Sequence, residues 1–129
     1  IRINLQEGDL PTLNPYVGLD LRSRCLFLAL YEPLMRRTPE GGLELAAADK
    51  VELDPTKTIY TFHIRPHEWS NGEKVTSYHF AEAWKYALSP GTPCGRADLL
   101  YVIKNAEPVK KGKLPLSELK IFTPDANTL

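Results

Sequence analysis

Residues 60–76, YTFHIRPHEWSNGEKVT, contain the pattern that decides the fold. Apolar residues alternate with polar ones over residues 60–64, which predicts a strand with one buried face. The Asn-Gly pair at residues 71–72 predicts a tight turn, because glycine adopts a positive φ without steric cost. Thr76 is a good N-cap, so a helix is expected to begin directly after this turn.

The segments on either side complete a hairpin and a helix. Residues 51–53 alternate in the same way as residues 60–64, and residues 54–57, DPTK, lie between the two runs. This arrangement predicts a β-hairpin with a four-residue connection. The expected helix after the turn has one apolar stripe, made of Phe80, Ala83, Trp84, Ala87 and Leu88.

The N-terminal third of the chain predicts a strand, a loop, a helix and a second strand. Residues 1–5 alternate between apolar and polar side chains, and the two prolines within residues 7–18 indicate a loop. Asp20 is a candidate N-cap for the helix. Residues 34–38 are a strand candidate, closed by a turn at residues 39–42. The apolar side chains of the helix are Leu21, Cys25, Leu28 and Ala29.

The C-terminal part predicts a short helix over residues 97–103, a strand at residues 121–122 and a turn at residues 124–127. A turn followed by Thr128 and Leu129 is expected to lead into a returning strand. A strand without its partner leaves open ladder groups. We therefore expect the chain to be a fragment of a longer protein, and the open strand edge offers a route to self-association.

Composition argues against two classes of protein. The chain has 129 residues, with 16 Lys and Arg against 16 Asp and Glu. A nucleic-acid binder usually carries a basic excess that contacts phosphates, so no nucleic-acid partner is expected. The longest apolar run, residues 25–31, is far below the roughly 20 residues of a membrane span. No N-terminal segment has the pattern of a secretory signal, which fits either a cytoplasmic protein or one whose signal has been removed.

The sequence contains none of the common catalytic motifs, such as GxSxG, a P-loop, GxGxxG or HExxH. His63 and His67 are four residues apart, but a proline lies between them, and surface or loop positions are favoured over a metal site. Glu68 and Glu73 flank Trp69 and are interpreted as solvated charges rather than as a glycosidase pair. We therefore expect no enzyme activity, no metal and no cofactor.

Tryptophans and cysteines are the remaining candidates. Trp69 either stacks on a ligand or plugs the end of the hairpin core, and the second interpretation is favoured. Trp84 is expected in the core. Cys25 lies in an apolar helical run and is expected to be a small buried hydrophobe, whereas Cys94 lies in a loop rich in glycine and proline. Their spacing does not decide whether the two form a disulfide.

Several motifs, in one order, resemble the family of bacterial solute-binding proteins for peptides, dipeptides and nickel. Residues 1–16, IRINLQEGDLPTLNPY, are similar to the family's first strand and a loop ending in Leu-(Asp/Asn)-Pro. Residues 26–42, LFLALYEPLMRRTPEGG, resemble its helix, strand and glycine turn, although Pro33 replaces the usual glycine.

The most specific part of the resemblance covers the second strand of the hairpin and the turn after it. Residues 60–65, YTFHIR, match Tyr-Thr-Phe-x-(Ile/Leu)-Arg, and residues 69–76, WSNGEKVT, match Trp-Ser-(Asp/Asn)-Gly-x-x-Val-Thr. The family's acidic residue early in the next helix is replaced here by Tyr78 or His79. We therefore expect the capping box of this helix to be missing.

The resemblance implies an α+β fold. The chain is expected to be an N-terminal fragment of a type II periplasmic-binding-protein fold, with mixed short sheets and helices. Residues 1–42 would be the N-terminal part of lobe I, and residues 43–129 the small extra domain, incomplete at its C-terminus. Family members are several times longer and close two lobes over a ligand.

The same resemblance implies a function and a site. It implies the peptide-binding component of an ABC transporter, located in the periplasm or lipid-anchored outside the cytoplasmic membrane, which delivers oligopeptides to permease subunits. The family's cleft segment corresponds to Gly18, Leu19, Asp20 and Leu21. Asp20 is either a ligand for the peptide amine or only a helix cap, and Cys94 is a candidate pocket position. The alternatives are a binding protein for nickel or another small ligand, and an interaction module without transport.

Overall fold

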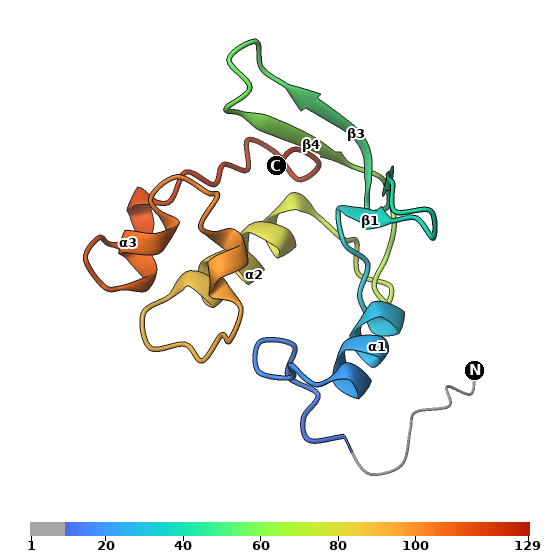
Figure 1. Ribbon diagram of the computed structural model, residues 1–129. Coiled ribbons are helices and arrows are strands. Elements are labelled where there is room, and N and C mark those ends of the chain that lie inside the picture. The colour runs from blue at the N-terminus through green and yellow to red at the C-terminus, as the bar shows by residue number, and fades with distance from the viewer. Residues whose placement is uncertain (1–9) are drawn as a thin grey trace. The chain divides into compact units, whose positions relative to one another are not determined.

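The computed structural model describes residues 10–129, so the strand expected over residues 1–5 lies outside the described residues (Figure 1). Two compact units are present. Unit 1 consists of the described part of Ile1–Glu32 together with Tyr86–Leu119, and unit 2 of Pro33–Lys85 with Lys120–Leu129. The domain boundary after residue 42 concerns the lobes of the intact protein and stays a prediction.

Unit 2 contains two antiparallel hairpins. In the first, β1 (Met35–Arg37) pairs with β2 (Leu43–Leu45), and the turn between them matches the one predicted at residues 39–42. In the second, β3 (Ala48–Leu53) pairs with β4 (Tyr60–Ile64), which confirms the predicted central hairpin. A bulge between Ala48 and Lys50 shifts the register of β3.

The connection of the central hairpin is longer than predicted and covers residues 54–59. Asp54 organises it, because its Oδ1 accepts the backbone N–H groups of Thr58 and Ile59 over 2.8 and 2.7 Å. Its Oδ2 accepts the N–H of Thr56 over 3.0 Å and also the hydroxyl of Thr56. The local sequence predicts a turn here. It does not predict the length of the connection, which depends on which N–H groups the Asp54 carboxylate accepts.

The last residues of the chain run beside β4 (Figure 1). Phe62 and Leu129 exchange two backbone hydrogen bonds of 2.9 and 3.0 Å, and the N–H of Ile64 donates to the carbonyl of Asn127 over 2.7 Å. The predicted turn is thus confirmed, whereas Thr128 forms an isolated antiparallel bridge with His63 and residues 127–129 are not assigned as a strand. The strand predicted at residues 121–122 is wrong, because this segment has no ladder partner assigned and the edge of β4 is occupied by residues 127–129.

Helix α2 (Ser77–Leu88) supplies much of the core of unit 2. Partly buried side chains, most of them aromatic, pack around a small cluster of buried residues. Trp84 packs there as predicted. The buried residues of this cluster are Leu34, Ala48 and Ile64, and the partly buried ones packed on them are Phe62, Phe80, Trp84 and Leu129.

The first turn of α2 corrects the expectation of a missing capping box. His79 Nδ1 accepts the backbone N–H of Thr76 over 3.0 Å, and the Thr76 hydroxyl lies 3.1 Å from the same nitrogen. The histidine therefore fills the role that glutamate or glutamine has in a capping box. The rings of His79 and Trp69 are perpendicular, with centroids 5.6 Å apart. Trp69 is 40% exposed, so the prediction that it fills the end of the hairpin core is wrong.

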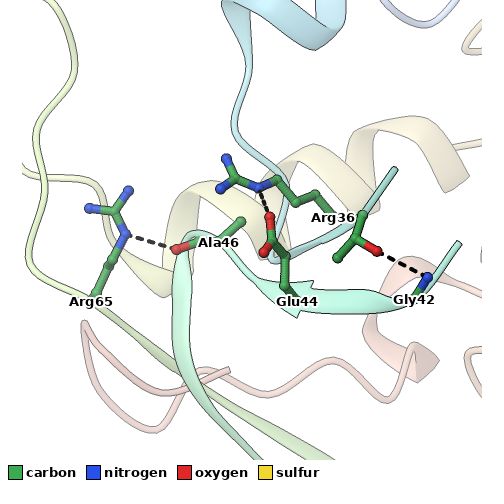
Figure 2. A network of polar contacts seen from close by, with 6 residues as sticks. Arg36, Gly42, Glu44, Ala46 and Arg65 are labelled. Carbon is green, nitrogen blue, oxygen red and sulfur yellow. Dashed lines mark hydrogen bonds and ion pairs between the residues drawn. The ribbon is translucent and has the colours of Figure 1, made fainter. Parts of the chain in front are cut away.

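Polar contacts hold the first hairpin and the segment that follows it (Figure 2). Arg36 Nε lies 2.5 Å from Glu44 Oε1 across the β1–β2 ladder, and the N–H of Gly42 donates to Thr38 Oγ1 over 3.2 Å. Arg65 Nε donates to the carbonyl of Ala46 over 2.8 Å. Figure 2 shows the Arg65 side chain reaching the chain between β2 and β3. The arginine of the YTFHIR motif thus has a scaffold role.

Unit 1 is built from short helices. These are α1 (Leu21–Leu30), the 3-10 helix η1 (Ala97–Leu100), α3 (Ala106–Lys110) and the 3-10 helix η2 (Leu116–Glu118). The short helix predicted over residues 97–103 is therefore only a 3-10 turn. The side chains of Leu88 and Val109 are fully buried.

Helix α1 begins after Asp20 and ends before Pro33, as predicted, and its apolar side chains are largely exposed. Cys25 is exposed and Leu28 is 79% exposed, so the expectation of a buried cysteine is wrong. The buried residue of α1 is Ser23, which faces Gly18. A helical stripe identifies an apolar side without showing which side has a partner.

Candidate functional site

The candidate segment begins with a turn that Asn14 organises in unit 1. The Asn14 side-chain Oδ1 accepts the backbone N–H of Tyr16 over 2.9 Å. Its backbone carbonyl accepts the N–H groups of Val17 and Gly18 over 3.2 and 3.0 Å. An asparagine followed by proline favours such a turn, because its side chain bonds the backbone two residues on. The turn directs the chain into residues 18–21.

Gly18 is buried and lies directly against α1. A Cβ at this position would be 2.8 Å from Phe27 Cε2 and 3.1 Å from Ser23 Cβ. Both distances are shorter than ordinary contacts, so only glycine fits without displacing the helix or the ring. The predicted role of Gly18 thus includes a packing requirement that fixes the distance between the loop and α1.

Asp20 is the N-cap of α1. Its Oδ1 accepts the backbone N–H of Ser23 over 3.0 Å, and its Oδ2 accepts the Ser23 hydroxyl over 2.6 Å. Arg22 Nε lies 3.9 Å from Oδ1. These hydrogen bonds, the one from the Ser23 side chain first, lower the pKa of the Asp20 carboxyl. Asp20 is therefore a carboxylate at neutral pH, with accepting capacity beyond the two bonds to Ser23.

Leu19 and Leu21 flank this carboxylate and are both largely exposed, at 50% and 66%. Two accessible apolar side chains beside a charged oxygen can contact a ligand that has both a cationic and an apolar part.

The loop that contains Cys94 lies against the candidate segment. The N–H of Gly95 donates to the carbonyl of Tyr16 over 3.0 Å. A Cβ on Gly95 would be 2.6 Å from Leu19 Cδ1, so the leucine side chain lies over the bare Cα of the glycine. The structure thereby brings together residues 18–21 and the Cys94 loop, which the sequence analysis proposed separately.

Tyr16 is the central contact of this arrangement, although its sequence position did not mark it as a candidate. Its ring packs on that of Tyr86, with centroids 5.0 Å apart and planes at 55°. Burial, and then the neighbouring Cys94, raise the pKa of the Tyr16 hydroxyl. The only local signal was an aromatic residue directly after the Asn-Pro pair, which gives no indication of its distant partners.

The other sequence candidates lie away from this segment or have structural partners. His63 Nε2 is 3.1 Å from Glu52 Oε2, and His67 Nδ1 is 2.7 Å from the carbonyl of Arg65. Within residues 10–129, no three His, Cys, Asp or Glu side chains are grouped as metal ligands would be. Cys25 and Cys94 are both free thiols. In the same part of the chain, no helix combines the length and the apolar character needed to cross a membrane.

Comparison with known proteins places these features in a family. Residues 42–129 match the family model described as bacterial extracellular solute-binding proteins, family 5 middle. The chain is 35% identical, over 92% of its length, to the oligopeptide-binding protein OppA of Bacillus subtilis strain 168, and it spans 22% of that relative.

Two solved structures are similar in fold. The substrate-binding domain of an oligopeptide ABC transporter from Bacillus anthracis strain Ames superposes with a TM-score of 0.91 at 32% identity, over 97% of this chain and 24% of that one. The Haemophilus influenzae OppA complex with the peptide RPPGFSPFR superposes with a TM-score of 0.83 at 30% identity, over 91% of this chain and 23% of that one. The chain thus spans about a quarter of these relatives, and the predicted fold class, a fragment of a periplasmic-binding-protein fold, is confirmed.

Proposed function

Because this chain belongs to the bacterial extracellular solute-binding proteins of family 5, we propose that it is part of the peptide-binding component of an ABC transporter. The whole protein captures oligopeptides outside the cytoplasmic membrane and delivers them to permease subunits. Relatives whose names state oligopeptide binding, and a similar structure determined with a bound peptide, support the ligand class.

One observation carries the assignment of the site. Residues 18–21 are held between the Asn14 turn and the N-terminus of α1, and the Cys94 loop packs against them through Gly95. The segment thus has contacts on both sides, while Leu19 and Leu21 are exposed. A preformed, partly apolar segment with one charged group is what a small-ligand site requires.

Each residue has a role in the proposal. Asp20 faces the ammonium group of the peptide, since its ionised carboxylate has acceptor sites beyond those that Ser23 occupies. Leu19 and Leu21 contact apolar parts of the ligand. Backbone groups of the segment bond the extended peptide in the manner of strand addition, which is indifferent to side-chain identity. Cys94, which is half-buried beside Tyr16, contributes to a pocket for a peptide side chain.

Isothermal titration of the full-length protein tests this function. A mixed library of short peptides should bind with an affinity typical of specific capture, and nickel ions alone should not. A protein that binds nickel but no peptide would overturn the proposal and favour the other ligand class of the family.

A further inference from the structure

Lys110 contacts three backbone carbonyls outside its own helix. It is the last residue of α3, and its ammonium group donates to three backbone carbonyls in unit 1. The distances from Nζ are 2.9 Å to Ala87, 3.1 Å to Ser89 and 2.7 Å to Thr92. An ammonium group has three donors, so this set matches its full capacity.

The first two carbonyls lie at the C-terminus of α2, which ends at Leu88. The last carbonyls of a helix have no intrahelical partners, and a cation there also interacts favourably with the helix dipole. Lys110 therefore caps α2 from a different element. Its bond to Ala87 holds the last turn of α2 directly after Tyr86, whose ring packs on Tyr16.

The third carbonyl lies in the loop that leads to Cys94. Thr92 is followed by Pro93, and three residues beyond Thr92 the N–H of Gly95 donates to the carbonyl of Tyr16. This loop includes Gly91, with a left-handed φ of 80°, and residues 91–96 belong to no helix or strand. Holding Thr92 limits the movement of Gly95.

Both groups of contacts made by Lys110 lead to Tyr16. The bond to Ala87 lies next to Tyr86, whose ring packs on the Tyr16 ring. The bond to Thr92 lies three residues before Gly95, whose N–H donates to the Tyr16 carbonyl. We propose that Lys110 is a positioning residue for the ligand-binding segment, fixing residues 16–21 through Tyr86 and Gly95 without touching the ligand. This inference rests on the proposed function for its effect on peptide affinity, but not for its effect on Gly95.

The test uses the full-length protein with Lys110→Met, which keeps a similar aliphatic chain and removes the donors. Lys113→Met is the matched control, since it removes the same charge from the segment directly after α3. Amide hydrogen exchange at Gly95 and peptide titration are measured on both. We expect Lys110→Met to speed exchange at Gly95 and to weaken peptide binding, each by about tenfold, with exchange in the first turn of α2 unchanged. The control should match the unsubstituted protein in both measurements.

If Lys110→Met does not fold, Lys110→Gln, which retains an amide donor, is measured in its place and should give an intermediate effect. Unchanged exchange at Gly95 would overturn the positioning role. Faster exchange with unchanged peptide affinity would also overturn it, because the loop would then not matter to the ligand. Absence of peptide binding by the unsubstituted protein would instead refute the proposed function, and the exchange comparison would still decide whether Lys110 holds the loop.

Discussion

His79 Nδ1 accepts the backbone N–H of Thr76 over 3.0 Å, so a histidine closes the first turn of α2. The same turn is fixed to the end of the chain, because the Ser77 hydroxyl donates to the carbonyl of Asp125 over 2.6 Å. The start of α2 therefore connects the helix to the segment that pairs with β4. Its stability matters to the whole of unit 2.

Replacing His79 by alanine should destabilise this turn by about 0.5–1 kcal/mol, because the N–H of Thr76 loses its acceptor. His79→Gln should retain most of the stability, since the glutamine carbonyl is the acceptor of an ordinary capping box. Amide exchange at residues 76–79 of the full-length protein measures the difference. Equal exchange in the alanine and glutamine variants would show that the histidine ring contributes by packing on Trp69 instead.

Replacing Arg65 by methionine should lower the free energy of unfolding by about 1.5–3 kcal/mol, because the carbonyl of Ala46 loses a charged donor. Arg37→Met, at an exposed position in β1, is the control and should change stability by less than about 0.5 kcal/mol. Chemical denaturation of the full-length protein measures the free energy of unfolding of both variants. Amide exchange in unit 2 then shows whether the loss of stability lies in that unit. Similar effects from both substitutions would mean that net charge matters more than the contact with Ala46.

The loop at residues 54–59 should depend on pH through Asp54. Hydrogen bonds, the one from the Thr56 side chain first, lower the pKa of this carboxyl from 3.8 to about 2. A depressed folded-state pKa means that the stabilisation is complete above about pH 4 and is lost as the pH falls towards 2. NMR titration of the Asp54 carboxyl, together with the amide shift of Ile59, measures this folded-state pKa. A titration midpoint near 4 would contradict the bonded arrangement.

Asp20→Asn separates the two roles of Asp20. Asparagine is as good an N-cap as aspartate, so α1 should keep its first turn. If the carboxylate also binds the peptide amine, affinity should fall by about two- to fivefold, the range expected of an exposed charge pair. Peptides with an acetylated N-terminus are the control and should lose little affinity. A loss that is the same for both kinds of peptide would point to a disturbed segment rather than to a lost charge pair.

Much of unit 2 could be predicted from local sequence. The alternation over residues 51–53 and 60–64 predicts the hairpin, although Val51, Leu53 and Tyr60 are exposed and only Ile64 is buried. The glycine at position 72 adopts the positive φ that its turn requires. Two-residue apolar runs are less informative. Residues 121–122 have strand-like side chains, but pairing is decided by which segment reaches the edge of β4, and that is a property of the whole unit.

In the candidate site, too, local features could be predicted and distant contacts could not. The capping role of Asp20 could be predicted because Asp20 directly precedes a helix. The contacts of Tyr16 with Gly95 and Tyr86 join residues that are far apart in the chain, and no periodicity encodes them. The same is true of Lys110, since a lysine at the end of a short helix gives no sign that three distant carbonyls converge on it.

The most direct test of the account is a hydrogen-exchange footprint of the full-length protein with and without saturating peptide. If residues 16–21 and the Cys94 loop form part of the ligand site, peptide should slow exchange of their amides, while the hairpin of β3 and β4 stays unchanged. Tight peptide binding without protection of residues 16–21 would contradict the account and place the ligand contacts on other parts of the protein.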